Sequence, residues 1–385
     1  MTQTFQECPH PDGGWSVSLE DLRDALVLPA ETRGFVQPLG IRRSDGSYCN
    51  TGAYWRNARP LSTEPPLPDN CTPAKLEGRW LWGGVLWRHF GHFLVESTGR
   101  LWGLDATERP PEGIVYVGKR PRSGNEIRDF QRAFWSLCGI DLQVKVIEEP
   151  TEVAELIVPG QGFGLGPIIS GTEPFRGFIS RRFGSYVEPD GSERLYISRA
   201  NLGSRKGGLI GEERIERLLA AEGYEIFHPE KHDLHTQVAR YKAAKKVLAV
   251  EGSALHLFAM CGRPHQQVGI ILRRQSVATN QILRHLQSFA GITPHRLDAL
   301  RNVYERKGGH KSRHDLGVPD LPRLERLLAE AGFVSGTADW PDLRWRYVKK
   351  IIGNDYDKRS KRRTSGTAES SPAQPASAVS SISIR

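Results

Sequence analysis

Between residues 194 and 274 the sequence alternates between short aliphatic segments and amphipathic helical patterns, and this alternation restricts the possible folds more than any other feature. Gly223 follows the last turn of one helical pattern, and Asp233 can cap the start of the next. Strands separated by helices become parallel neighbours through crossover connections. The pattern therefore predicts a doubly wound α/β domain. Its expected strands are RLYISR, YEIFHP, KVLAV and QVGIILRR, and its expected helices are GEERIERLLAAEG, DLHTQVARYKAAK and GSALHLFAM.

The first half of the chain predicts a less regular α/β arrangement. Residues 1–75 are rich in Pro, Gly and short polar segments, so we expect irregular structure there with a few edge strands. An aromatic stretch over 78–104 predicts a strand, a turn at Gly83–Gly84 and a helix with Phe93 and Leu94 on its apolar face. Two α/β domains that face a cleft are therefore expected. Further strands are expected at IVYVG, QVKVIEE and AELIVPG, and helices at NEIRDFQRAFWSLCG and EPFRGFISRRFG.

A loop of Pro, Gly and Asp at 188–192 predicts the boundary between the two domains. The end of the chain is Ser-rich and lacks apolar periodicity, so we expect it to be disordered. The predicted division is a first domain over 1–187, a second over 193–300, a helical segment over 301–354 that packs back, and a disordered basic tail over 355–385.

The basic charge of the chain is concentrated near its end. The formal net charge is +9, but residues 340–385 contribute +6, which leaves +3 for the first 339 residues. So small a surplus argues against a specific nucleic-acid partner, and the tail is interpreted as solvated or as a peripheral contact with an anionic membrane. The sequence has five scattered cysteines, no long apolar run and no N-terminal signal pattern. These features favour a cytoplasmic protein, either free or peripheral to the inner face of the membrane.

Polar residues follow the ends of the expected parallel strands, which is where open sheets bind ligands. Gly252 begins a turn into a helix whose first N–H groups can bind phosphate, and arginine side chains bind phosphate through two nitrogens. The sequence therefore predicts a nucleoside diphosphate site, without the G-x-G-x-x-G or P-loop motif. The strand ends carry Arg199, His228, Glu251–Gly252 and Arg273–Arg274, and Arg205 and Lys206 lie on the loop after the first strand.

The segment HFGHFLVESTGRL resembles the N-terminal signature of glycosyltransferase family 61, in which an acidic residue and an arginine follow a histidine. Three later segments resemble further motifs of the family in the same order, between about 85 and 275. The turn after KVLAV departs from the family pattern, with Glu251 before the glycine and His256–Leu257 after Leu255, and Gly211 replaces an asparagine. The matching positions are His92, Phe93, Leu94, Glu96 and Arg100, then Arg199, then Glu212, Pro229 and Glu230, then Gln237, Gly252, Ser253, Ala254 and Leu255.

What this resemblance implies is an inverting glycosyltransferase with a GT-B-like pair of Rossmann-like domains. It implies a UDP-sugar donor, a glycan acceptor and a role in capsular or surface polysaccharide synthesis, with no cofactor and no metal. Glu96 would remove the acceptor proton, and His92 would orient Glu96 or bind the acceptor. The donor and its diphosphate would be bound by Arg199, Arg205, Lys206, His228, Gly252, Ser253 and Ala254, with Arg100, Gln237 and Glu251 in supporting positions.

Other interpretations of the same residues stay open. Glu96 could form a structural ion pair with Arg100, four residues later on a helix. Trp80, Trp82 and Trp87 could be core residues instead of sugar platforms. The chain could be another nucleotide-dependent enzyme on the same architecture, such as an epimerase. It could also be a non-catalytic protein that binds a glycan or a polyanion through its basic tail.

Overall fold

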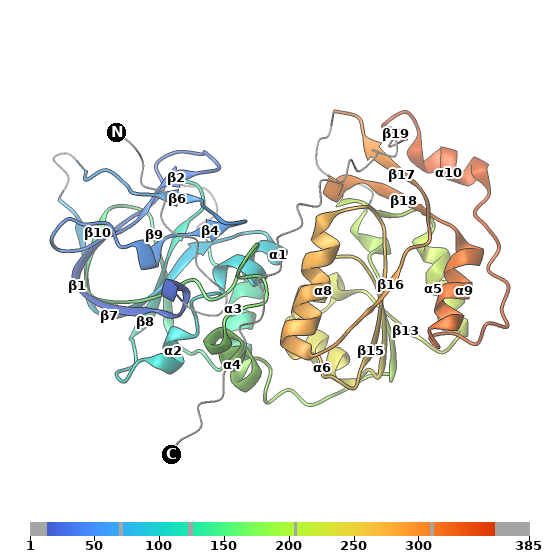
Figure 1. Ribbon diagram of the computed structural model, residues 1–385, viewed down its shortest axis with the longest axis horizontal. Coiled ribbons are helices and arrows are strands. Elements are labelled where there is room, and N and C mark those ends of the chain that lie inside the picture. Colours follow the sequence, from blue (N-terminus) through green and yellow to red (C-terminus); the bar gives the residue numbers. More distant parts are fainter. Residues whose placement is uncertain (1–13, 69–71, 122–125, 204–205, 309–311, 359–385) are drawn as a thin grey trace, which may run out of the picture.

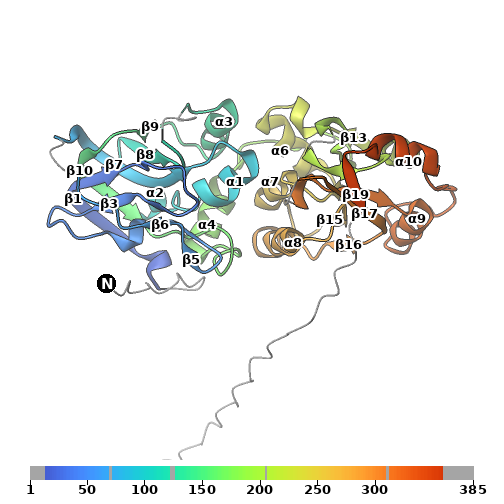
Figure 2. The same ribbon diagram turned by 90° about the horizontal axis from the view of Figure 1, so that it is seen from above.

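The computed structural model describes residues 14–68, 72–121, 126–203, 206–308 and 312–358. Two large sheets lie side by side, and helices from both halves of the chain pack between them (Figure 1). Figure 2 shows the same separation from above, with α1 and α3 of the first half beside α6 and α7 of the second. No helix in the described ranges is long and apolar enough to cross a membrane. The predicted Arg205 and the tail beyond Lys358 lie outside the described residues.

The first sheet is mixed, with the strand order β3-β1-β10-β7-β8-β9. Strands β7, β8, β9 and β10 run parallel, whereas β1 is antiparallel to both of its neighbours, β3 and β10. This half is therefore α/β and less regular than the second, as predicted, with two strands added by antiparallel pairing to four parallel ones. The bounds are β1 Leu19–Leu28, β3 Gly40–Arg42, β7 Ala74–Leu86, β8 Gly113–Gly118, β9 Gln143–Ile147 and β10 Thr151–Pro159.

Strand β1 lies inside the first sheet, although only edge strands were expected in residues 1–75. Its charged first half is largely exposed, and only its second half buries alternate side chains, beginning with Ala25 and Val27. Asp24, between the two halves, has a positive φ of 51°. The period-two signal of a strand is therefore too short to recognise in the sequence.

The predicted turn at Gly83–Gly84 is a bulge inside the 13-residue strand β7. A side chain at Gly83 would collide with the Tyr116 ring, and Gly84 has a φ of +89° beside the Arg100 guanidinium. The two glycines thus allow close packing while the strand continues to Leu86. The predicted regular helix is a short α-helical turn, α1 (Phe90–His92), followed by a π-helical turn, η3 (Phe93–Ser97).

The second sheet confirms the predicted parallel architecture. Its five strands have the order β13-β11-β14-β15-β16 and all run parallel. Helices α6, α7 and α8 pack on one face, and α5 and α9 on the other, so the domain is doubly wound. The strand order reverses between β11 and β14, which makes that edge the expected ligand-binding position. The bounds are β11 Arg194–Ile197, α5 Glu212–Ala221, β13 Glu225–Phe227, α6 Leu234–Ala243, β14 Lys246–Val250, α7 Ala254–Cys261, β15 Gln267–Ile271, α8 Val277–Ala290, β16 His295–Leu297 and α9 Leu321–Glu330.

The segment after residue 300 is not purely helical as predicted. Strands β17 (Leu300–Arg306) and β18 (Leu316–Pro319) join β12 (Gly208–Leu209) and β19 (Tyr356–Lys358) in a small sheet. Helix α10 (Trp345–Ile352) packs on it through Val348 and Ile352. Because β19 pairs with β17, the first residues of the tail predicted to be disordered form a strand.

The remaining elements are short or lie around the two sheets. They are η1 Gly14–Val17, β2 Gln37–Pro38, η2 Asn50–Gly52, β4 Trp55–Arg56, β5 Arg59–Pro60, β6 Ser62–Thr63, α2 Gly103–Ala106, α3 Asp129–Leu137, α4 Glu173–Arg182, η4 Ala200–Leu202, η6 Pro229–Lys231 and η7 Ser312–His314.

Candidate active site

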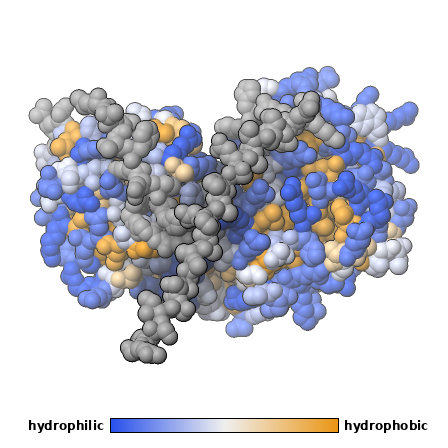
Figure 3. All heavy atoms as spheres, viewed as in Figure 1, coloured by the Kyte–Doolittle hydropathy of each residue, from blue (hydrophilic) through white to orange (hydrophobic). Residues whose placement is uncertain are grey.

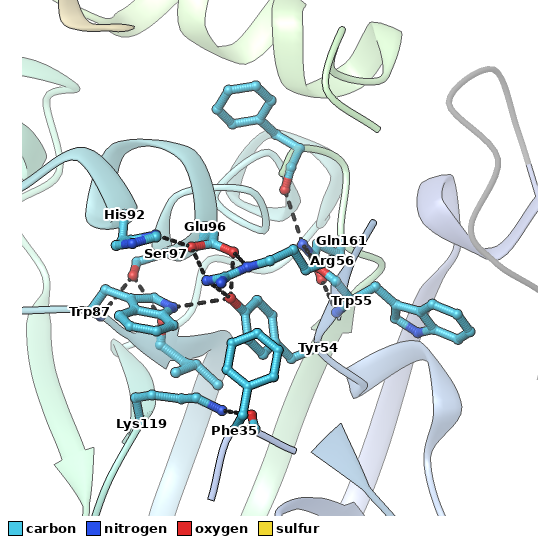
Figure 4. A network of polar contacts seen from close by, with 12 residues as sticks. Phe35, Tyr54, Trp55, Arg56, Trp87, His92, Glu96, Ser97, Lys119 and Gln161 are labelled. Atoms are coloured by element: carbon cyan, nitrogen blue, oxygen red, sulfur yellow. Dashed lines mark hydrogen bonds and ion pairs between the residues drawn. The ribbon is translucent and has the colours of Figure 1, made fainter. Parts of the chain in front are cut away.

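Glu96 is the centre of a buried polar network on the π-helical turn η3 (Figure 4). Its fully buried carboxylate accepts hydrogen bonds from Tyr54 Oη at 2.5 Å and from Arg56 through Nε at 2.5 Å and Nη2 at 2.6 Å. Nδ1 of His92 lies 2.6 Å from the same carboxylate, as the spacing of four residues predicts. Wide π-type turns occur often at functional sites.

The surroundings of Glu96 hold its carboxylate in the ionised form. Burial raises the pKa of Glu96, but hydrogen bonds from His92 and Arg56 and the charge of Arg56 outweigh burial and lower the pKa below its ordinary value. A carboxylate so strongly stabilised as an anion is a weak proton acceptor. The geometry therefore does not favour the predicted role of Glu96 as the general base.

His92 is better placed to exchange a proton with a substrate. Its side chain is 30 % exposed, whereas that of Glu96 is fully buried. In the neutral imidazole the hydrogen lies on Nδ1, which faces the carboxylate, and Nε2 carries the lone pair. The ring stacks on Trp87 with a centroid distance of 4.6 Å. Glu96 and Trp87 thus orient an imidazole whose other nitrogen can act on a ligand.

Arg100 does not form the alternative ion pair with Glu96. The guanidinium donates to the backbone oxygens of Thr51 at 2.7 Å and Ala53 at 2.6 Å, and also to that of Pro159. Its complete burial lowers the pKa of Arg100 to about 10. Arg100 therefore anchors the segment that leads into Tyr54 and Arg56, and it supports the network around Glu96 through the backbone.

Sequence reasoning missed Tyr54 and Arg56. Both lie in a region that was expected to be irregular, about forty residues before Glu96, and no periodic pattern connects them to it. Burial and the nearby Glu96 charge raise the pKa of Tyr54 well above its ordinary value, so the phenol stays a hydrogen-bond donor. The available signal was chemical: a tyrosine and an arginine on either side of Trp55 in the segment AYWRN.

The three tryptophans differ in their surroundings. Trp82 is fully buried and donates from Nε1 to the Gly52 oxygen at 3.1 Å, and Trp80 is 3 % exposed. These two are core residues, as one of the alternatives proposed. Trp87 is only partly buried and donates to Tyr54 Oη at 3.2 Å. Only Trp87 therefore belongs to the network around Glu96.

On the second sheet, Arg199 and Gly252 meet at the edge where the strand order reverses. Arg199 follows β11, and Gly252 follows β14. A Cβ atom on Gly252 would lie 2.5 Å from Arg199 Nη1, so the glycine leaves room for the guanidinium. The backbone N–H groups of 252–254 begin helix α7, where the first turn offers donors without helical partners. The structure brings the predicted arginine and helix N-terminus together.

Two further arginines complete a cationic cluster with Arg199. Arg274 binds Glu251 Oε1 through Nε at 2.9 Å and Nη2 at 2.6 Å, and Arg273 Nε donates to the Glu251 backbone oxygen at 3.0 Å. Burial, followed by the nearby charges of Arg274 and Arg199, lowers the pKa of Arg273 to about 9. Arg274 is thus paired with the buried Glu251 carboxylate, whereas Arg199 and Arg273 form no ion pair with a described residue, although the charges of Glu212 and Asp315 act on them. Glu251, a departure from the family pattern, is therefore the counter-ion of Arg274.

Glu212 fixes the loop that carries Arg199. Its Oε1 accepts hydrogen bonds from the Arg199 backbone N–H at 2.6 Å, from Ser198 Oγ at 3.2 Å and from Tyr196 Oη at 3.2 Å. Burial raises the pKa of Glu212, although these hydrogen bonds oppose the rise. Lys206 belongs to the same loop, and its backbone oxygen accepts a hydrogen bond from Arg199 Nη2 at 3.4 Å.

His228 and Gln237 lie at the side of this cluster. His228 Nδ1 is 3.1 Å from the Asn201 amide nitrogen, and its Nε2 is 3.5 Å from Glu216 Oε1. Gln237 donates to the backbone oxygens of Pro229 at 2.9 Å and His232 at 3.0 Å, so it fastens the segment after β13 to helix α6. The described residues contain no group of three or more His, Cys, Asp or Glu side chains that could hold a metal ion.

The network around Glu96 and the arginine cluster lie close together. A Cβ atom on Gly91 would lie 2.6 Å from Ser253 Oγ, so α1 approaches the turn before α7. Burial, the charge of His92, and then those of Arg313 and Lys206 lower the pKa of His89, so charges from both halves of the molecule act on this side chain. The surface is indented between the two halves of the molecule, with hydrophilic residues beside the indentation (Figure 3).

Comparison with known proteins gives one family match. No curated protein matches the chain. A family model, described as Glycosyltransferase 61, matches residues 90–268, which include His92, Glu96, Arg199 and the turn at Gly252. Residues 90–268 therefore belong to glycosyltransferase family 61, a family of enzymes that transfer a sugar from a donor to an acceptor.

Proposed function

We propose that this protein is an inverting glycosyltransferase that moves a sugar from a UDP-sugar to a hydroxyl group of a glycan acceptor. One observation carries the proposal: the His92–Glu96 pair lies beside a surplus of guanidinium groups at the edge where the parallel sheet reverses its strand order. The first group can accept a proton, and the second can bind a diphosphate.

His92 acts as the general base. Its Nε2 lone pair accepts the proton of the acceptor hydroxyl while that oxygen attacks the anomeric carbon. The ionised Glu96, 2.6 Å from Nδ1, stabilises the imidazolium that forms. Arg56 and Tyr54 hold the carboxylate in place and keep it charged. The predicted roles of the two residues are thereby exchanged, since Glu96 orients and His92 accepts the proton.

The arginine cluster stabilises the leaving group. As the new bond forms, the bond between the anomeric carbon and the diphosphate oxygen breaks, and its electron pair leaves with UDP. Arg199, Arg273 and the N–H groups at the start of α7 bind this developing charge, with Lys206 and Arg313 near the same position. Since these groups supply positive charge, the proposal includes no metal ion.

The proposed architecture is GT-B-like, with the acceptor on the first sheet and the donor on the second. The boundary lies at 188–192, between α4 and β11, where the chain passes from one sheet to the other. His228 is positioned to contact the nucleotide base, because it follows β13, next to β11 in the sheet. The assignment of UDP and of a role in capsular or surface polysaccharide synthesis depends on the family resemblance.

The test is thermal stabilisation by UDP, GDP, CDP, CMP, TDP and NAD, each with and without EDTA. We expect UDP alone to raise the melting temperature, EDTA to leave this shift unchanged, and Arg199→Ala to abolish it. Arg326→Ala, which removes an exposed arginine on α9, serves as the control and should keep the shift. If no nucleotide stabilises the folded protein, the donor site is wrong. If the shift requires a divalent metal, the metal-free mechanism is wrong.

A further inference from the structure

A row of stacked side chains leads away from the imidazole of His92. Trp87 stacks on His92 at 4.6 Å, and the Arg56 guanidinium lies 5.2 Å from the Trp87 ring. The guanidinium carbon of Arg56 also lies 5.5 Å from the centroid of the Phe35 ring, and that of Arg59 lies 5.3 Å from the same centroid. Figure 4 shows His92, Trp87, Arg56 and Phe35 in this arrangement. Aromatic rings and guanidinium planes thus alternate from the proposed base towards the surface.

The outer end of this row is exposed. Phe35 is 49 % exposed, and Arg59 is also exposed. If Phe35 served only to cover Arg56, burial of its ring would be expected, whereas about half of it remains open to solvent. An exposed ring at the end of a row that begins at the proposed base is a suitable platform for a sugar, because the C–H face of a pyranose packs on aromatic rings.

The same position carries uncompensated positive charge. The Lys119 ammonium lies 5.8 Å from the Phe35 ring and donates to the Phe35 backbone oxygen at 2.6 Å. Burial, and then the nearby charge of Arg56, lower the pKa of Lys119 to about 8; Arg120 acts in the same direction and Glu96 opposes it. Glu96 is already bound by Arg56, and Arg59 forms no ion pair with any described residue.

The three cations around Phe35 repel one another, and a single aromatic ring cannot compensate for their positive charge. Arg56, Arg59 and Lys119 all lie within 5.8 Å of the Phe35 ring centroid. A carboxylate or phosphate group next to the ring would relieve this repulsion and form charge-assisted hydrogen bonds with a free guanidinium. A neutral sugar would use the ring but would leave the charge uncompensated.

We propose that Phe35 and Arg59, with the buried Lys119 ammonium 5.8 Å from the ring, together called the Phe35 surface, bind an acidic glycan. This inference rests on the proposed function, since it identifies the acceptor of the transfer as a glycan that carries carboxylate or phosphate groups. One sugar ring of the acceptor stacks on Phe35 with its acidic group against Arg59. The reacting hydroxyl, on a neighbouring unit, then reaches Nε2 of His92 along the stacked row.

The test measures the affinity of the full-length protein for matched oligosaccharides by calorimetry. The probes are tetragalacturonic acid, its methyl ester, and mannotetraose with and without a phosphate monoester. At low salt we expect an acidic probe to bind roughly tenfold more tightly than its neutral partner, the effect of one or two charge-assisted hydrogen bonds. This difference should shrink at high salt. The preferred acid, carboxylate or phosphate, identifies the acidic group.

Variants then locate the site. Arg59→Gln should reduce the affinity for the acidic probe about fivefold, in the range of an exposed charge contact, and leave the affinity for the neutral probe unchanged. Phe35→Ala should weaken both. Arg326→Gln, the same change on the exposed face of α9, should bind like the native protein. Equal affinities for acidic and neutral probes, or native affinity in Arg59→Gln, would overturn the inference.

The UDP measurement on the same samples separates this inference from the proposed function. If UDP stabilises the protein but acidic probes have no advantage, the Phe35 surface is wrong and the donor assignment stands. If the acidic probe binds through Arg59 while no nucleotide stabilises the protein, the surface is supported as a glycan-binding site and the transferase proposal fails.

Discussion

The two halves of the candidate site differ in how completely their charged side chains are paired. On the first sheet, Glu96 is matched by Arg56, Tyr54 and His92, so its negative charge is fully compensated inside the protein. On the second sheet, Arg274 is paired with Glu251, whereas Arg199 and Arg273 form no ion pair with a described residue. A compensated network holds a catalytic side chain in one orientation, whereas an uncompensated one attracts a charged ligand.

The largest effect is expected from removal of the proposed base. His92→Asn should lower the rate of sugar transfer by roughly 10²- to 10⁴-fold, the usual contribution of a positioned general base. UDP binding should stay unchanged, because the arginine cluster is intact. His265→Asn, on an exposed turn before β15, is the matched control and should retain most of the activity. Equal losses in both variants would contradict the assignment of His92.

The next largest effect tests whether the ion pair with Arg274 stabilises the buried carboxylate of Glu251. Arg274→Met leaves the carboxylate buried without its ion-pair partner and should cost about 3–5 kcal/mol in the free energy of unfolding. Urea unfolding measures this loss, and Glu251→Met combined with Arg274→Met should recover most of it. As a control, Lys245→Met breaks an exposed pair with Glu193 and should cost less than about 1 kcal/mol. A stable Arg274→Met protein would show that Glu251 has another partner.

A smaller effect distinguishes orientation from proton transfer at Glu96. Glu96→Gln keeps the shape of the side chain but removes the charge that stabilises the imidazolium, so we expect a loss in kcat of about 10²-fold with little change in KM. If this loss equals that of His92→Asn, the two residues act as one unit. A loss well above that of His92→Asn would restore Glu96 as the base.

The lowered pKa of Glu96 also predicts the pH dependence of stability. Since its pKa lies lower in the folded protein than in the unfolded chain, Glu96 contributes stability above pH 4.5, and this contribution is lost as the pH falls through the folded-state pKa. Urea unfolding at successively lower pH should therefore show a shallower acid decline for Glu96→Gln than for the native protein. Glu77→Gln, on an exposed side chain, should follow the native curve. An unchanged decline in Glu96→Gln would refute the lowered pKa.

The smallest effect concerns the contact between the two halves. Gly91→Ala would place a methyl group 2.6 Å from Ser253 Oγ, so α1 and the turn before α7 must move apart. We expect a loss of roughly 1–2 kcal/mol in stability and a fall in kcat, because His92 shifts relative to the donor site. UDP affinity should change little. Gly177→Ala, within helix α4, adds a methyl group that meets only the guanidinium end of Arg181, so it controls for the change of a helical glycine to alanine.

Much of the second sheet could be predicted because the sequence patterns of its helices, helix caps and strands are local. Asp233 caps α6 by accepting from the Thr236 N–H, as its position before the helix indicated. The arginines after β11 and β15 could be placed at one edge, since parallel strands bring their carboxyl ends together. The first sheet could not be predicted equally well. Its antiparallel strand β1 and the bulge at Gly83–Gly84 depend on neighbours that are distant in the sequence.

By itself, the sequence determined the parallel α/β alternation, the positions of the strand ends and the spacing of His92 and Glu96, because helical and strand periodicities and crossover connections are local rules. Only the tertiary structure decided that Tyr54 and Arg56 bind Glu96, that Arg100 anchors backbone oxygens, and that Arg274 neutralises Glu251. These contacts join residues 23 to 59 positions apart. Such residues come into contact only when the packed core brings their strands and turns together, and no periodicity in the sequence indicates these contacts.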